Sequence, residues 1–172
     1  MKTMRRRSLI RLGGLVAVGA VLSGCGFALR RTPQLPFGSL HLSGFSPLSP
    51  MADELRRQLR QSPGLTLSES ATEAEVMLIA LADAQEQVVV ATTTAGQVRE
   101  LTVRARLRFK VRSRAGQELI PETELSLSRD MSFSERESLA KESERTLILG
   151  TLQQDIARQV MRRLAALPPV RG

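Results

Sequence analysis

Residues 101–112 read LTVRARLRFKVR, the most regular alternation of apolar and charged side chains in the chain. The odd positions are apolar: Leu101, Val103, Ala105, Leu107, Phe109 and Val111. The even positions from 104 onward are cationic: Arg104, Arg106, Arg108, Lys110 and Arg112. Successive residues of a β-strand point to opposite faces of the sheet. The pattern therefore predicts a strand with one apolar face, which packs on a core, and one strongly basic face, which meets solvent.

Shorter patterns on both sides of this strand supply the other predicted elements. A strand is predicted over 39–45, bending at Gly44, and an apolar run over 76–82 continues as a more exposed strand to residue 90. A last strand is predicted over 119–131. Ser49 before Pro50 indicates a helix start, because serine caps a helix and proline suits its first position. Pro63-Gly64 ends this helix, and the polar segment 66–75 is predicted to be a loop.

A long helix is predicted over 134–167, followed by Pro168-Pro169. Ser134 and Glu137 have the spacing of a capping box. Leucine, isoleucine and valine recur at intervals of three and four along the helix, which is the spacing of a buried helical face. Ile156 and Val160 lie in the middle of this stripe, so they are the expected core positions of the helix.

The predicted order is strand, helix, three strands, helix. This order indicates an α+β two-layer domain over 39–167, with two helices packed on one face of a four-stranded mixed β-sheet. The apolar positions of 101–111 fit the helix-covered face, so the opposite face is expected to be exposed and basic. Residues 168–172 form a short tail.

The N-terminus has the features of an export signal with a lipid-attachment site, residues 1–24. Five basic residues precede an uncharged run over 12–22, which is shorter than the roughly 20 residues that span a membrane. The run ends in Leu22-Ser23-Gly24-Cys25, which resembles the lipobox of bacterial lipoprotein precursors. We expect cleavage before Cys25 and attachment of acyl and diacylglycerol groups to it; a buried cysteine behind an ordinary secretory signal is the alternative.

The segment 25–38 is expected to be a lipidated tether, because its prolines and glycines disfavour regular structure. Gly26 stands where many lipoproteins retained at the inner membrane carry aspartate, so the outer membrane is the expected destination. Arg6-Arg7 resembles a twin-arginine export signal, but a Sec signal also tolerates two arginines, and both routes remain open.

Composition and side-chain chemistry exclude several functions. Five of the 25 basic residues lie in the signal and all 17 acidic residues lie after it, so the net charge falls from +8 to +3 on cleavage. This small charge and the lack of Trp and Tyr argue against nucleic-acid binding. One histidine, His41, and one lipid-bearing cysteine support neither a zinc site nor a nucleophile–base pair. We expect a non-enzyme without cofactor or metal, apart from the lipid on Cys25.

The basic row 104–112 has two interpretations. Its arginines and lysine suit a multiply charged anionic partner such as the phosphates of lipid A, because guanidinium groups form two-pronged contacts with phosphate. Alternatively the row is a solvated sheet face, partly neutralised by cross-strand acids such as Glu122 and Glu124.

Several loose motifs follow one another in the mature chain. They are 25–30 after the lipobox, Leu55, Arg56 and Leu59 in the first helix, the turn 95–97, Arg129 at a strand end, and the runs 139–144 and 156–164. In this order and spacing the chain resembles the LPS-assembly lipoprotein family LptE over essentially the whole mature part.

The resemblance implies an outer-membrane lipoprotein on the periplasmic face. Members of the family plug the large barrel LptD, help it to assemble, and bind lipopolysaccharide on its way to the outer leaflet. The lysine of the Leu-Ala-Lys run is implicated in that binding, and Lys141 occupies its position. The family's second basic position, before the Gly-Gln turn, is Thr94 here, so the row at Arg104, Arg106, Arg108 and Lys110 is the candidate replacement.

A second hypothesis is a structural envelope lipoprotein that binds no lipid. In that case the basic sheet face contacts acidic loops of a protein partner.

Overall fold

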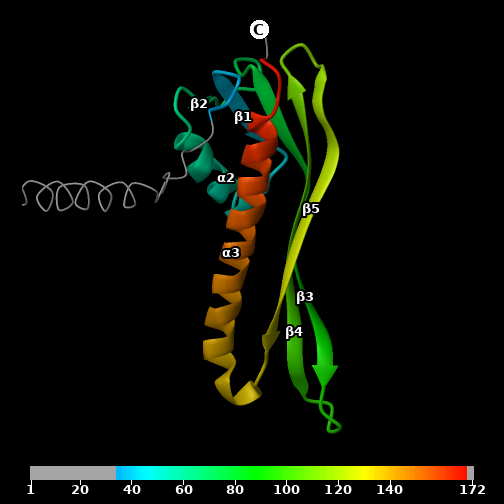
Figure 1. Ribbon diagram of the computed structural model, residues 1–172. Coiled ribbons are helices and arrows are strands. Elements are labelled where there is room, and N and C mark those ends of the chain that lie inside the picture. Colours follow the sequence, from blue (N-terminus) through cyan, green and yellow to red (C-terminus); the bar gives the residue numbers. More distant parts are fainter. Residues whose placement is uncertain (1–33, 170–172) are drawn as a thin grey trace, which may run out of the picture. The chain divides into compact units, whose positions relative to one another are not determined.

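A computed structural model describes residues 34–169 as a five-stranded mixed sheet with two helices on one face (Figure 1). The strand order is β2-β1-β3-β4-β5. The strands are β1 Ser39–Ser43, β2 Thr66–Leu67, β3 Val76–Thr92, β4 Val98–Ser113 and β5 Glu118–Ser132. The helices are α2 Pro50–Arg60 and α3 Ser138–Ala165, preceded by a 3-10 turn Glu135–Glu137. The predicted signal, the lipobox, Cys25 and most of the tether lie outside the described residues.

The α+β class and the helix-covered sheet were predicted correctly, but the number of strands was wrong. The extra strand, β2, lies in the segment predicted as a loop and pairs in parallel with β1, Ser39 opposite Thr66 and Leu40 opposite Leu67. The backbone N–H of Thr66 donates to the carbonyl of Gly38 at 2.9 Å, which starts the pairing. A strand of two residues is too short to show an alternation in the sequence. It forms because β1 offers its unpaired backbone groups on this side.

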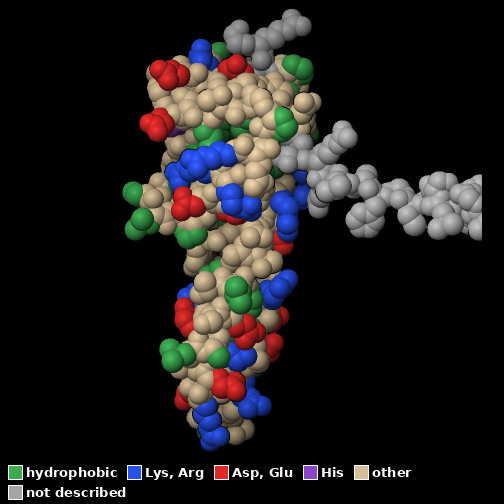
Figure 2. Space-filling model, turned by 90° about the vertical axis from the view of Figure 1, so that its left-hand side faces the viewer, with side chains coloured by type: hydrophobic (Ala, Val, Ile, Leu, Met, Phe, Trp, Pro, Cys, Tyr) green, Lys and Arg blue, Asp and Glu red, His purple; other side chains and the backbone are tan. Residues whose placement is uncertain are grey.

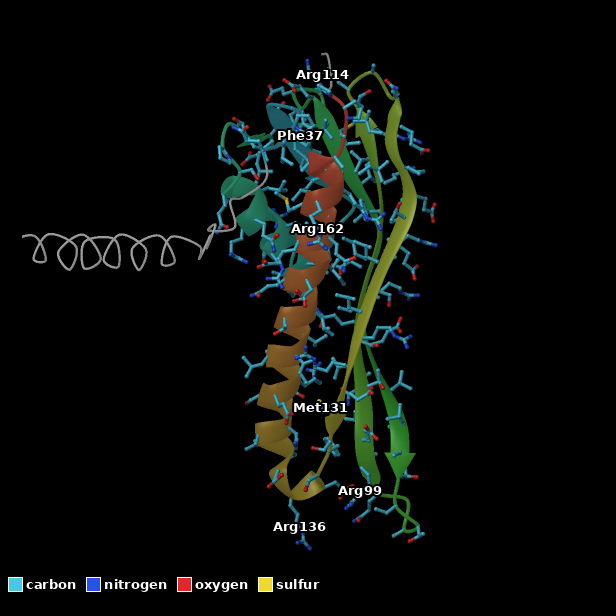
Figure 3. All side chains as sticks on the ribbon, viewed as in Figure 1. Phe37, Arg99, Arg114, Met131, Arg136 and Arg162 are labelled. Atoms are coloured by element: carbon cyan, nitrogen blue, oxygen red, sulfur yellow. The ribbon has the colours of Figure 1, made fainter. Side chains whose placement is uncertain are left out.

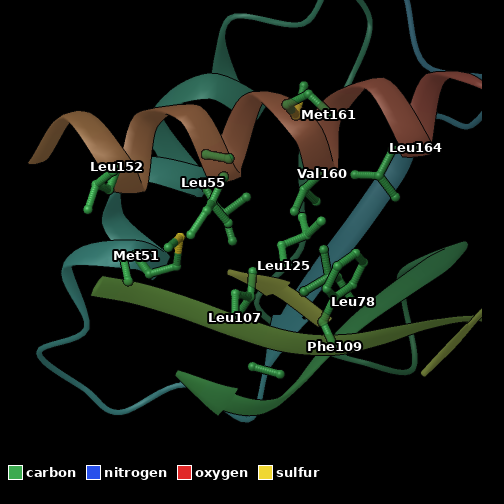
Figure 4. Close-up of a cluster of buried hydrophobic side chains, with 14 of the residues drawn as sticks. Met51, Leu55, Leu78, Leu107, Phe109, Leu125, Leu152, Val160, Met161 and Leu164 are labelled. Carbon is green, nitrogen blue, oxygen red and sulfur yellow. The ribbon is translucent and has the colours of Figure 1, made fainter. Parts of the chain in front are cut away.

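The core lies between the helices and the apolar face of β4, as the alternation predicted. All six odd positions of β4 from 101 to 111 are buried. They meet one face of α3, and α2 closes the upper part of the layer (Figure 4). The buried helical side chains include Met51, Leu55, Leu59, Leu149, Leu152, Ile156, Val160 and Leu164.

The predicted start of α2 is confirmed, and the cap also joins the helix to the sheet. Ser49 Oγ accepts a hydrogen bond from the backbone N–H of Ala52 at 2.9 Å. The same hydroxyl donates to Asp83 Oδ2 on β3 at 2.5 Å. One serine therefore satisfies a free N–H of the first helical turn and fixes the position of the helix against β3.

The predicted capping box before α3 is wrong. Ser134 makes no side-chain cap bond, and the α-helix begins four residues later, at Ser138. The N–H of Glu137 instead donates to the carbonyl of Ser134 at 3.1 Å, an i to i+3 bond that closes a 3-10 turn. The helix ends at Ala165, two residues before the predicted end, where the N–H of Ala166 bonds back to the carbonyls of Arg162 and Arg163.

Gly44 ends β1 where β3 carries a bulge. The register of β3 against β4 shifts between Ala80 and Ala82. Gly44 has φ +79°, and a Cβ at this position would lie 2.1 Å from the carbonyl oxygen of Ala80. Only glycine fits this backbone conformation and this close approach. Because of the bulge, the side chains of β3 that point away from the helices are odd-numbered before it, Met77 and Ile79, and even-numbered after it.

Replacing Ile156 with Ala is expected to lower the free energy of unfolding by about 2–5 kcal/mol, because the side chain is fully buried in the middle of the α3 stripe. Chemical denaturation of the mature chain measures this. The exposed Gln154→Ala serves as the control on the same helix. A change in Ile156→Ala as small as that of the control would contradict the packing.

Replacing Gly44 with Ala is expected to destabilise the chain more than replacing Gly64 with Ala. Both glycines have φ near +80°, which costs an alanine about 1–2 kcal/mol. A methyl group at Gly64 meets nothing within 4 Å, whereas at Gly44 it meets the β3 backbone, adding about 1–3 kcal/mol. Thermal unfolding of the two variants side by side measures the difference. Equal losses of stability would show that the close approach of Gly44 to Ala80 has no effect.

Candidate functional site

The face of the sheet away from α2 and α3 carries the basic row of β4. Both helices pack on the other face (Figure 1). The row, which consists of Arg104, Arg106, Arg108, Lys110 and Arg112, is half-buried apart from the exposed Arg108. The structure thus brings the predicted candidates on β4 together on one face, here called the open face. Its chemistry depends on what the neighbouring strands place beside each cation.

Carboxylates from β3 and β5 flank Arg104, Arg106 and Arg108, which form the lower part of the row. Glu86 on β3 lies 2.7 Å from Arg106 and 3.5 Å from Arg104, measured between side-chain nitrogen and oxygen. Glu122 on β5 lies 3.4 Å from Arg108, and Glu124 is the register partner of the same arginine. The open face is therefore less basic than the alternation of β4 alone predicts. Cross-strand pairs of opposite charge also stabilise the sheet itself.

Lys110 and Arg112 have different surroundings. The register places Ile79 of β3 beside Lys110 and Met77 beside Arg112. None of the ion pairs among residues 34–169 includes either cation. Glu118 is the β5 register partner of Arg112, but the two side chains form no ion pair. The upper end of the row is therefore positively charged with an apolar border.

Lys141 does not join the row. It lies in the first turns of α3, and its Nζ donates to Ser132 Oγ at 3.0 Å and to Glu144 Oε2 at 2.9 Å. Its side chain is only 15% exposed, so the amine holds the start of α3 against the end of β5. Ser128, opposite Arg104, lies four residues from Ser132, about 13 Å along a strand. Lys141 and the row are therefore separate points on the domain.

Lys141 lies at the same end of the domain as the turn between β3 and β4, which contains Thr94. Arg99 and Arg136 mark this end in Figure 3, and Arg114 marks the opposite one. One turn further along α3, Arg145 pairs with Glu142. Hydrogen bonding from Arg145 holds the pKa of the Glu142 carboxyl below its ordinary value. From the side of the helices, acidic and basic side chains are intermixed along the surface (Figure 2).

His41 has a structural partner. Its Nδ1 lies 2.9 Å from the carbonyl oxygen of Ser68, so this nitrogen carries the proton and donates it. Within residues 34–169 no group of three His, Cys, Asp or Glu side chains could hold a metal ion. The chemistry available on the open face is anion binding by guanidinium and ammonium groups.

Glu86 was missed in the sequence. It lies four residues after Ala82, where the register has already shifted, so the face to which it points cannot be found by counting in twos from Val76. A bulge changes the parity of every later residue and leaves no clear mark in this sequence. The partner of Arg104 and Arg106 became visible only with the register of β3 against β4.

A family model described as "LptE: Lipopolysaccharide-assembly" matches residues 37–164, almost the whole described domain. The chain belongs to the LptE family. The "LPS-assembly lipoprotein LptE" of Photorhabdus laumondii is 30% identical over 94% of this chain and 87% of its own length. The protein of the same name from Yersinia pestis is 27% identical over 94% of this chain and 77% of its own length.

Solved structures share the fold. The solution structure of uncharacterized lipoprotein B from Nitrosomonas europaea has a TM-score of 0.69 at 23% identity, over 82% of this chain and 91% of that one. The crystal structure of rare lipoprotein B from Shewanella oneidensis has a TM-score of 0.62 at 20% identity, over 74% of this chain and 94% of that one. The arrangement of two helices on a mixed sheet is therefore common to these lipoproteins.

Membership of the LptE family makes the chain a lipoprotein of lipopolysaccharide assembly, a non-enzymatic component of lipopolysaccharide transport. Over residues 34–169, the helices are too short or too polar to cross a membrane. The expectation of a non-enzyme is confirmed by the family.

Replacing Glu86 with Gln is expected to lower the free energy of unfolding by about 0.5–1 kcal/mol at low ionic strength, because both of its ion pairs are partly exposed. The loss should shrink at 1 M salt, where the Debye length falls to about 3 Å. Denaturation at the two salt concentrations measures this. Glu100→Gln, an exposed acid outside the ion pairs, is the control, and a loss independent of salt would show that Glu86 acts through packing.

Proposed function

We propose that the mature chain is an outer-membrane lipoprotein, anchored through acyl and diacylglycerol groups on Cys25 and facing the periplasm. Residues 1–24 are the signal peptide, 25–38 the lipidated tether, 39–167 the LptE-like α+β domain and 168–172 a short tail. The chain forms a complex with an LptD-type barrel, plugs it and assists its assembly. It also binds lipopolysaccharide during delivery to the outer leaflet. The match to the lipopolysaccharide-assembly family over residues 37–164 carries this proposal.

Exposed leucines on α3 support a barrel partner. Leu139 is 86% exposed and Leu147, two turns further on, is 73% exposed. Large apolar side chains left in solvent often mark protein contacts, although single ones are common on surfaces. Between them and beyond, the outward positions Ser143, Gly150 and Thr151 are small or uncharged. The outer side of α3 therefore suits close packing against another protein.

The cations support a lipopolysaccharide contact. Lys141 uses two of its three N–H donors within the chain, leaving one for a phosphate oxygen. Arg104, Arg106 and Arg108 are held by exposed carboxylates, and such ion pairs contribute only about 0–1 kcal/mol each. A multiply charged phosphate can displace these carboxylates, because arginine binds phosphate with two parallel hydrogen bonds.

The partial neutralisation of Arg104, Arg106 and Arg108 by carboxylates of the chain also favours the second candidate function. A face whose cations already have Glu86 and Glu122 as partners is stable in water without any ligand. In this alternative the chain is a structural envelope lipoprotein, and the open face contacts a protein. Charge reversal on the row then weakens the complex, and lipopolysaccharide binding is absent in every variant.

Affinity purification of a C-terminally tagged chain from detergent-solubilised outer membranes is expected to recover a large barrel protein in stoichiometric amount. Mass spectrometry identifies the partner. Cys25→Ala is the matched control, because it removes the lipid and leaves the domain unchanged, and it should be absent from the outer-membrane fraction. Recovery of the wild-type chain alone, or from the inner membrane, would contradict the proposal.

The double variant Lys141→Glu, Arg106→Glu is expected to bind lipopolysaccharide at least about tenfold more weakly, because a repulsive charge replaces each contact. Titration of the purified complex with labelled lipopolysaccharide measures the affinity. The control Arg145→Glu, Arg136→Glu reverses two charges elsewhere, one of them on the same helix, and should change it less than threefold. Equal binding by wild type and the test variant would remove Lys141 and Arg106 from the site.

A further inference from the structure

The cations of the open face fall into two groups according to their partners. Arg104, Arg106 and Arg108 each lie within 3.5 Å of a carboxylate oxygen. Lys110 and Arg112 take part in no ion pair within residues 34–169. Their positive charge is therefore the least compensated on this face. An anion approaching them therefore breaks no ion pair that forms within residues 34–169.

The strand register explains why the two groups differ. Above the bulge of β3, two rows run across the open face, His41–Met77–Arg112 and Ser43–Ile79–Lys110. Below the bulge, Glu86 comes beside Arg104 on the same face. The bulge thus separates an upper part, where Met77 and Ile79 flank the cations, from a lower part. There β3 places Ala82, Ala84 and Glu86 on the open face, and Glu86 reaches both Arg104 and Arg106.

The upper cations lie close together and are partly shielded from solvent. Arg112 and Lys110 are half-buried, and the Nε of Arg112 is shielded from solvent without an acceptor. The terminal nitrogens of Arg112 are not among the shielded, unpaired atoms. The two side chains stand two residues apart on one strand face, about 7 Å along the backbone.

Met77 and Ile79 add an apolar element to the same patch. Both are half-buried on the side of β3 that faces away from the core. A ligand that carries both phosphate and hydrocarbon therefore matches the patch better than an acidic protein loop, which would leave Met77 and Ile79 without an apolar contact. Lys110 follows Phe109, whose partner on β5 is Thr123, and Thr123 is nine residues from Ser132, the contact of Lys141, or about 30 Å along the strand.

We propose that Lys110 and Arg112, together with Met77 and Ile79, form a lipopolysaccharide subsite separate from Lys141. The two cations bind a phosphate of the lipid head group, and the apolar pair contacts the adjoining hydrocarbon. This inference rests on the proposed function and narrows it to one end of the open face. A phosphate that binds the lower arginines must first displace Glu86 or Glu122, whereas Lys110 and Arg112 form no such ion pair within residues 34–169.

The test is titration of the complete lipoprotein–barrel complex in detergent with labelled lipopolysaccharide and with the same lipopolysaccharide stripped of phosphate. Lys110→Ala, Arg112→Ala should weaken binding of the phosphorylated form at least tenfold and abolish the preference for it. The control Arg57→Ala, Arg60→Ala removes the same charge from exposed positions of α2, on the helix side of the domain, and should stay within threefold of wild type. Ile79→Ser should weaken binding of both forms.

Unfolding temperatures and recovery of the barrel show whether each variant is folded and assembled. The charge-preserving Lys110→Arg, Arg112→Lys should bind like wild type.

Wild-type affinity in Lys110→Ala, Arg112→Ala, or equal losses in the two alanine double variants, would overturn the subsite and leave lipopolysaccharide binding intact. Loss of barrel recovery with unchanged lipopolysaccharide affinity would assign the patch to a protein contact instead. Absence of binding by wild type would overturn the subsite and the lipid-binding part of the proposed function together.

Discussion

Burial of the apolar face of β4 is the constraint on which the rest of the domain depends. Leu107 and Phe109 are fully buried beneath the helices, and β3 and β5 pair with this strand along most of its length. A shift of one residue would place five cations in the core and six apolar side chains in water. The strand therefore has one register relative to the core. Its basic face follows from that register, because each cation lies between two buried neighbours in the sequence.

The same register distributes charge over the open face. Below the bulge, Glu86 forms ion pairs with two arginines and offsets one of their two charges. Above the bulge, Met77 and Ile79 occupy the corresponding places, and Lys110 and Arg112 keep their charge. The bulge of β3 between Ala80 and Ala82, which Gly44 approaches closely, thus separates the cations that have carboxylate partners from Lys110 and Arg112.

Patterns that repeat over many residues were predicted from the sequence, and single local contacts were not. The alternation of β4 and the stripe of α3 gave the class of the fold, the buried face and the core position of Ile156. Strand β2 and the 3-10 turn at Glu135–Glu137 depend on one or two backbone hydrogen bonds that leave no periodic trace. The candidates on β4 were found because they share its period. Glu86 was missed because the bulge reverses the parity of its strand.

We propose that the two sides of the domain have different partners: the open face contacts lipopolysaccharide, and the outer side of α3 contacts the barrel. Photo-cross-linking in intact cells tests it most directly, with the reactive side chain placed at Ile79 in one variant and at Leu147 in the other. We expect cross-links to lipopolysaccharide from position 79 and to the barrel from position 147. Lipopolysaccharide cross-links of equal yield from both positions, or only barrel cross-links from position 79, would contradict it.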